Sequence, residues 1–156
     1  MKGIRTRALA VIAAVVLLTL SLGAGVVAAD SRDHRNAENT FTKWVTAWPA
    51  MAGIVGGDVG DGTFAGEVLS ATNPTPTSME LNAAYHFNGS RHSFTALVDV
   101  LQTGLDFGGT AVITGQVTEG WLKGNLVQGG YTVVHCDQGM CFQGWFDILR
   151  GSKTRD

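Results

Sequence analysis

The stretch of sequence that decides the fold is SMELNAAYHFNGSRHSFTALVDV, residues 78–100. Apolar and polar residues alternate through both of its halves, which is the pattern of strands with one buried and one solvated face. The dipeptide Asn88-Gly89 lies between the halves and is the pair that best suits a two-residue hairpin turn. The stretch is therefore predicted to form a β-hairpin with one apolar face and one mostly polar face.

A two-residue turn at this point also predicts which residues face each other across the hairpin. It places Phe87 opposite Ser90 and Tyr85 opposite His92, and the other pairs follow in order. Tyr85 and His92 would then lie together on the otherwise apolar face. A slip of one residue would exchange the two faces, so we expect the faces to be strongly specified.

The rest of the chain after Gly62 continues in the same manner. Six segments rich in β-forming residues alternate with turn-like spacers, and none shows a sustained helical period. Strands are predicted at residues 63–70, 78–87, 90–102, 110–118, 127–136 and 141–149. Glycines recur inside the later segments, and glycine within strands marks bulges and bends where a sheet curls. We predict an all-β domain, a sandwich or a barrel, with the glycines favouring a barrel.

The segment at residues 41–48 is compatible with either a helix or a strand. Phe41, Trp44, Val45 and Trp48 follow the spacing of one helical face. Valine, threonine, phenylalanine and tryptophan also favour strands, and the segment is short. Its type stays open at this point, and in either form its aromatic side chains are expected to close a core.

Residues 1–29 have the order of a secretion signal. Three basic residues, the last of them Arg7, precede an apolar stretch from Ala8 to Leu22, and small residues lead to Ala29. This order predicts a signal peptide cleaved near Ala29 and a secreted protein. An uncleaved membrane anchor is the alternative, because the uncharged stretch approaches the roughly 20 residues that span a bilayer.

The chain that remains after residue 29 has the size of a single domain. Residues 30–40 are predicted to be a polar spacer, and residues 41–156 a single β-barrel domain. The leader carries three of the eleven basic residues, so eight remain against thirteen acidic residues, a net charge of −5. That balance, without a basic run, argues against nucleic acid and, once the leader is removed, against a membrane as partners.

Cys136 and Cys141 are the two cysteines of the chain. In a protein sent to an oxidising compartment they predict one disulfide, which would make them facing partners in the final hairpin, with Val134 opposite Gln143. Only His135 is close enough to add a metal ligand, so no metal site is expected. Dinucleotide and catalytic-triad motifs are missing, and no cofactor is expected.

Four glycine- and strand-rich segments resemble the allene oxide cyclase and dirigent barrel superfamily. They are GTFAGEVL (62–69), AAYHF (83–87), GTAVITG (109–115) and GGYT (129–132). The resemblance covers roughly residues 55–150 and implies a small calycin-like antiparallel barrel of about eight strands with a ligand-holding lumen. Family members include cyclases and proteins that hold a reactive small molecule in a chosen conformation. No catalytic residue is carried over from them.

Candidate site residues come from the predicted register. Tyr85 and His92 could supply a proton donor and acceptor to a bound carbonyl or epoxide. Glu67 is a third catalytic candidate if it is partly buried. A polar pair of this kind is more often a satisfied structural contact than a catalytic one. Large apolar side chains that would contact a ligand are Phe87, Phe94, Met79 and Trp121.

The function predicted from the sequence is that of a secreted barrel that holds an apolar small molecule and has no assignable catalytic motif. One alternative is a cyclase or isomerase that steers ring closure. The other is a structural barrel whose lumen is filled by its own side chains. A cavity of about 300 Å³ or more with polar groups would favour a ligand site over a filled core. The sequence predicts no oligomeric state.

Overall fold

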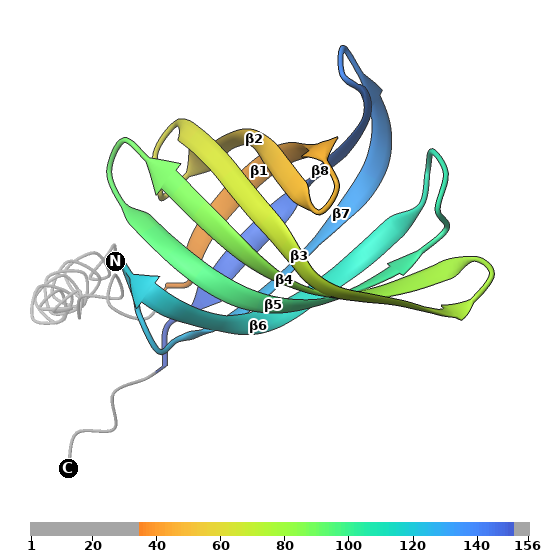
Figure 1. The fold of residues 1–156 in the computed structure, drawn as a ribbon. Coiled ribbons are helices and arrows are strands. Elements are labelled where there is room, and N and C mark those ends of the chain that lie inside the picture. The colour runs from red at the N-terminus through yellow and green to blue at the C-terminus, as the bar shows by residue number, and fades with distance from the viewer. Residues whose placement is uncertain (1–34, 152–156) are drawn as a thin grey trace, which may run out of the picture. The chain divides into compact units, whose positions relative to one another are not determined.

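The computed structural model describes residues 35–151, which form a closed antiparallel β-barrel of eight strands (Figure 1). The strands are β1 (Ala37–Ala47), β2 (Ala50–Gly57), β3 (Gly62–Thr75), β4 (Ser78–Gly89), β5 (Ser93–Thr103), β6 (Thr110–Gly120), β7 (Leu126–Cys136) and β8 (Gly139–Leu149). Each strand pairs with the next, and β8 pairs with β1. The predicted all-β barrel is confirmed. The predicted signal peptide lies outside the described residues.

Strand β1 covers the segment whose type the sequence left open. Side chains at Ala37, Asn39, Phe41 and Lys43 are buried and alternate with more exposed neighbours. The strand form prevails over the helix because β1 pairs with β2 on one side and with β8 on the other. The barrel therefore begins at Ala37, inside the predicted spacer, rather than at residue 41.

The hairpin of β4 and β5 has the predicted faces but a different register. Tyr85 pairs with Ala96, so the predicted pairing of Tyr85 with His92 is wrong. The connection is longer than two residues because it binds to the β2–β3 turn, where the amides of Arg91 and His92 both donate to the Val59 carbonyl at 3.1 Å. The shift from residue 92 to residue 96 is four residues. Because that number is even, the inward and outward faces are preserved.

The final hairpin contains the predicted disulfide. Cys136 and Cys141 are bonded, with their Cα atoms 5.9 Å apart. The predicted register is wrong by two residues, because Cys136 pairs with Gly139 and Val134 pairs with Cys141 rather than with Gln143. Gly139 has φ 94°, a conformation open to glycine that allows the tight turn. The disulfide thus links diagonal neighbours rather than facing partners.

The two ends of the barrel carry different sets of connections (Figure 1). The β1–β2, β3–β4, β5–β6 and β7–β8 hairpins lie at one end, which we refer to as the open end. The β2–β3, β4–β5 and β6–β7 connections lie at the other, the closed end, where the described chain also begins and ends. Within residues 35–151 there is no helix long and apolar enough to cross a membrane.

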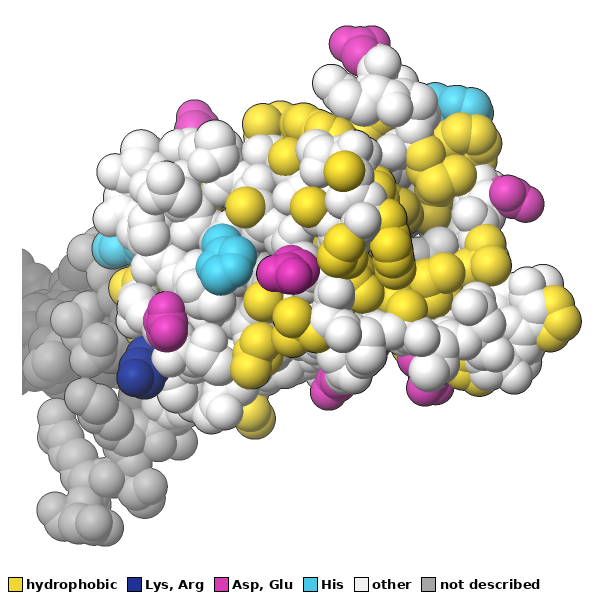
Figure 2. All heavy atoms as spheres, in the orientation of Figure 1, with side chains coloured by type: hydrophobic (Ala, Val, Ile, Leu, Met, Phe, Trp, Pro, Cys, Tyr) yellow, Lys and Arg dark blue, Asp and Glu magenta, His cyan; other side chains and the backbone are white. Residues whose placement is uncertain are grey.

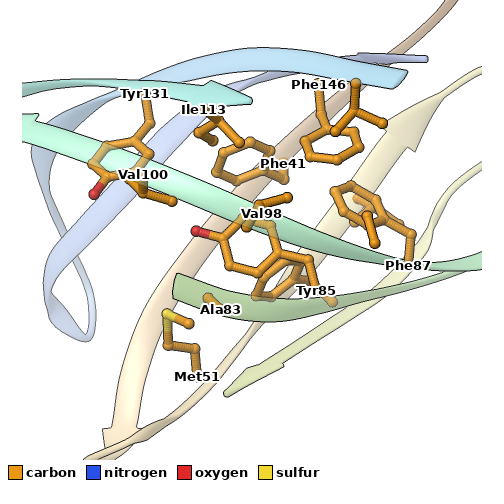
Figure 3. Close-up of a cluster of buried hydrophobic side chains, with 14 of the residues drawn as sticks. Phe41, Met51, Ala83, Tyr85, Phe87, Val98, Val100, Ile113, Tyr131 and Phe146 are labelled. Carbon is orange, nitrogen blue, oxygen red and sulfur yellow. The ribbon is translucent and has the colours of Figure 1, made fainter. Parts of the chain in front are cut away.

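Aromatic rings fill the closed half of the lumen. The ring centroid of Phe87 lies 4.6 Å from that of Phe94, 4.8 Å from that of Phe146 and 5.5 Å from that of Phe64. Each of these four side chains is at most 3% exposed. Figure 3 shows Phe87, Phe146 and Phe41 converging inside the barrel. The rings of this half are packed as closely as those of an ordinary protein core.

Asn39 holds the β2–β3 turn in place across the closed end of the barrel. Its Nδ2 donates to the Phe146 carbonyl at 3.1 Å, and its Oδ1 accepts from the Val59 amide at 2.8 Å. The β2–β3 turn is thereby held over the lumen, with the Val59 side chain fully buried. Since the buried amide of Asn39 is hydrogen-bonded at both ends, it closes the barrel without leaving a polar group unsatisfied.

Candidate ligand site at the open end

A cavity of about 170 Å³ lies in the open half of the barrel. Figure 2 shows apolar side chains gathered around a hollow on this part of the surface. The apolar wall consists of Val45, Trp48, Met51, Val68, Met79, Leu81, Leu105, Met140 and Phe142. Lys43, Gln102 and Tyr131 bring charged or polar groups to it. An apolar pocket with a few convergent polar groups is the usual form of a small-molecule site.

The cavity is smaller than the sequence-based criterion of about 300 Å³ for a drug-sized ligand. Two side chains of its wall, Val45 and Trp48, are 44% and 59% exposed, and they form part of the rim. The space therefore suits a small molecule, or one end of a longer molecule that leaves past this rim.

Lys43 is the charged residue of the cavity wall and is only 2% exposed. It projects inward from β1 and pairs with Gly53 on β2. A Cβ atom on Gly53 would lie 2.8 Å from the Lys43 Cα, closer than carbon atoms normally approach. The absence of a side chain at Gly53 therefore lets the two strands and the lysine stem fit together.

Aromatic groups surround the Lys43 amine. Nζ donates a hydrogen bond to the Tyr85 hydroxyl and lies 4.1 Å from the Tyr85 ring centroid and 4.8 Å from that of Tyr131. Three phenylalanine rings follow at 5.6–5.8 Å, those of Phe41, Phe64 and Phe142. Ring faces attract an ammonium group and partly replace its lost hydration.

No acidic side chain balances the lysine within the described part of the chain. The only ion pair among residues 35–151 joins Arg35 to Glu38 on the surface. Burial without a counter-ion disfavours the charged amine, and it lowers the pKa of Lys43 to about 7. Near neutral pH the amine is therefore shared between its charged and neutral forms.

The two tyrosines beside Lys43 shift in the opposite direction. Burial, and secondly the nearby Tyr131, raise the pKa of Tyr85 well above its ordinary value. Burial likewise raises the pKa of Tyr131. Both phenols therefore stay protonated across the pH range in which the lysine titrates, and both can donate hydrogen bonds.

A hydrogen-bonded pair forms a second polar edge of the cavity. The Tyr131 hydroxyl donates to Gln102 Oε1 at 2.7 Å, and Gln102 Nε2 donates to the Gly104 carbonyl at 3.0 Å. Figure 3 shows the hydroxyl groups of Tyr131 and Tyr85 pointing in the same direction, away from Phe87 and Phe146. The two tyrosine hydroxyl groups thus lie on the open side of the aromatic cluster.

The candidates predicted from the sequence fall in separate places. Met79 lines the cavity, and Tyr85 is fully buried against Lys43. Glu67 is exposed on the outer face of β3. His92 and Trp121 stack at 4.0 Å at the closed end, far from the cavity along the barrel.

Two further candidates, Phe87 and Phe94, belong to the closed half, where their rings stack on each other. Sequence reasoning missed Lys43, Gln102 and Tyr131. Gln102 could have been predicted, because it continues the inward alternation that includes Phe94 in the predicted hairpin. Lys43 could not be assigned to the interior, because the sequence did not decide whether residues 41–48 form a helix or a strand.

Comparison of the chain with models of protein families, with curated proteins and with solved structures finds no match. Within the residues that the structure describes, no three His, Cys, Asp or Glu side chains gather as they would around a metal ion. The functional assignment therefore rests on the chemistry of the open-end cavity.

Proposed function

We propose that this protein is a secreted binding protein that holds a small apolar molecule in the open half of its barrel. The observation that carries the proposal is the division of the lumen. One half is filled by phenylalanine rings, whereas the other contains a cavity with an apolar wall and the polar groups of Lys43, Gln102 and Tyr131. Secretion is supported by the pattern of residues 1–29 and by a disulfide, which persists in oxidising compartments.

The buried lysine favours binding over a purely structural role. Burying an amine without a counter-ion costs stability, and an apolar side chain of similar size would fill the position at lower cost. Residues that cost stability and have shifted pKa values gather at functional sites. The unbalanced Lys43 therefore supports a ligand whose polar group meets Nζ while its apolar body contacts the surrounding methionines and leucines.

A cyclase or isomerase of the allene oxide cyclase or dirigent type is the second candidate. It is favoured by one contact, the hydrogen bond between Lys43 and Tyr85. A protonated phenol beside an amine that titrates near neutral pH can exchange a proton with a bound molecule. This pair takes the place of the Tyr85–His92 pair predicted from the sequence.

Binding is tested with a probe that matches the cavity, hexan-1-ol, by saturation-transfer NMR on the full chain. A Met79→Trp variant narrows the cavity and is expected to reduce the transfer several-fold. Leu97→Trp is the matched control, because Leu97 is exposed on the outer face of β5. Equal transfer in the two variants, or none in the unaltered protein, would contradict the proposal.

A further inference from the structure

We propose that Lys43 captures small apolar aldehydes covalently, as an imine, in the open-end cavity. This inference rests on the proposed function, because the apolar tail of the aldehyde must occupy the cavity before its carbonyl carbon meets Nζ. It assigns a chemical class of ligand to the site, and it gives the buried amine a role that simple apolar binding leaves unexplained.

The surroundings of Lys43 suit an amine nucleophile. Tyr85 from β4 and Tyr131 from β7 are the titratable groups that face it, and both keep their protons. The strands packed beside and across from β1 add no charge at their neighbouring inward positions. Those positions are Met51 and Gly53 on β2, Phe64 and Gly66 on β3, Val98 and Val100 on β5, Ala111 and Ile113 on β6, and Phe142 and Gly144 on β8.

The free-amine fraction separates this lysine from an ordinary one. Because the pKa of Lys43 is lowered to about 7, about half of its amine is unprotonated at pH 7. A lysine in water has a pKa near 10.4, so its free fraction at that pH is lower by a factor on the order of a thousand. Desolvation of a lysine in an apolar pocket is an established way to activate it as a nucleophile.

The reaction balances without any further reagent. The Nζ lone pair forms a bond to the carbonyl carbon, and the carbonyl π electrons move to the oxygen, which receives a proton from Nζ. The hydroxyl group and the remaining Nζ proton then leave as one water molecule, and a C=N bond is formed. An amine and an aldehyde thus give an imine and water, with no oxidation or reduction.

Two tyrosines assist in different ways. The Tyr131 hydroxyl is part of the cavity wall, and by turning from its present acceptor, Gln102 Oε1 at 2.7 Å, it can donate a hydrogen bond to the carbonyl oxygen as charge develops there. Tyr85 is fully buried behind the lysine and hydrogen-bonds Nζ, so it is a positioning residue. The apolar wall around them keeps water from the product and slows hydrolysis of the imine.

The test incubates the full chain with hexanal at pH 7, traps imines with sodium borohydride and locates the alkylated residues by peptide mass mapping. Lys123, which is exposed in the β6–β7 connection, serves as an internal comparison. We expect alkylation at Lys43 to exceed that at Lys123 by about tenfold or more. Hexan-1-ol should compete at Lys43 and leave Lys123 unaffected.

Three variants sharpen the result. Lys43→Met should abolish the alkylation of the β1 peptide, whereas Lys123→Gln should leave it unchanged. Tyr85→Phe should lower the initial rate of trapping at Lys43 several-fold and shift its pH profile, with the far-ultraviolet circular dichroism unchanged. A Tyr85→Phe profile identical to that of the unaltered protein would overturn the positioning role of Tyr85.

The outcomes separate the two proposals. If hexan-1-ol binds but Lys43 is alkylated no more than Lys123, imine capture is overturned and apolar binding stands. If hexanoate binds more tightly than hexan-1-ol through Lys43 and no imine is trapped, the lysine is an ammonium receptor for carboxylates, and imine capture is again overturned. If neither hexan-1-ol nor hexanoate binds and Lys43 is alkylated no more than Lys123, the proposed function is overturned together with imine capture.

Discussion

The closed and open halves of this barrel are built from the same eight strands, but the interior of the closed half is filled by side chains and that of the open half contains a cavity. In the closed half, phenylalanine rings interlock and the buried Asn39 is fully hydrogen-bonded. In the open half, Met51, Met79 and Met140 border a cavity that holds an uncompensated lysine. Rigid rings define a single packing, whereas methionine side chains adapt to varied shapes. The comparison indicates that one half supplies stability and the other supplies a site.

The largest expected effect comes from the closed half. Phe87→Ala removes a ring that packs against four other phenylalanine rings, and we expect it to lower the free energy of unfolding by about 3–5 kcal/mol. Chemical denaturation followed by circular dichroism measures this loss. Phe87→Leu, which retains most of the volume, should cost clearly less. If the free energy of unfolding of Phe87→Ala lies within about 1 kcal/mol of that of the unaltered protein, the closed half is not the main source of stability.

The disulfide gives the next effect, at the rim of the open half. Replacing Cys136 and Cys141 by serine frees a short loop, and the chain-entropy relation for such a loop predicts a loss of about 2 kcal/mol. The denaturation midpoint of the double variant checks this value. Because the closed half is untouched, unfolding should remain a single cooperative transition, and a second transition would show that the halves unfold separately.

The pH dependence of stability isolates Lys43. Its pKa is lowered to about 7 in the folded state and is near 10.4 when unfolded, so between these values the unfolded chain binds more protons. The free energy of unfolding should therefore rise with pH from about 7 to 10, by on the order of 1 kcal/mol per pH unit at the steepest. Below pH 7 both states carry the proton and this dependence vanishes.

The control for this profile is Lys43→Met, which should be more stable than the unaltered protein at pH 7 and lack the rise. Above about pH 10 the raised pKa values of Tyr85 and Tyr131 act in the other direction, because the unfolded phenols ionise first and stability falls. A profile of Lys43→Met that still rises between pH 7 and 10 would contradict the assignment.

The smallest effect on stability is expected in the cavity wall. Met79 is only partly buried and already borders empty space, so Met79→Ala should cost about 1 kcal/mol. The same change enlarges the cavity and should shift the ligand preference from hexan-1-ol toward a longer alcohol. Calorimetric melting and ligand competition measure the two effects. A loss as large as that of Phe87→Ala would mean that the open half is also a packed core.

The alternation of residue types predicted the faces of the barrel well. The hairpin at residues 78–100 correctly assigned Ala83, Tyr85, Phe87 and Phe94 to the interior. This succeeded despite a wrong register, because an even shift leaves each side chain on its face. Side-chain period is a local property of a strand, and so the sequence carries it directly.

The register and the site were not predictable in the same way. Asn88-Gly89 does not form the hairpin turn by itself, because the loop is held by the carbonyl of Val59 from a distant part of the chain. Lys43 was missed because its segment satisfies helical and strand periods alike, and only pairing with β2 and β8 decides between them. Contacts between distant segments determine both features, and no local pattern encodes them.

The most direct test of the central claim is a methyl NMR titration of the full chain with hexan-1-ol. We expect the methyl signals of Met51, Met79 and Met140, which line the cavity, to shift progressively. The signals of Val59 and Val117, which are buried in the closed half, should stay unchanged. Shifts of equal size in both halves, or shifts confined to exposed outer methyl groups such as those of Leu97 and Val112, would contradict it.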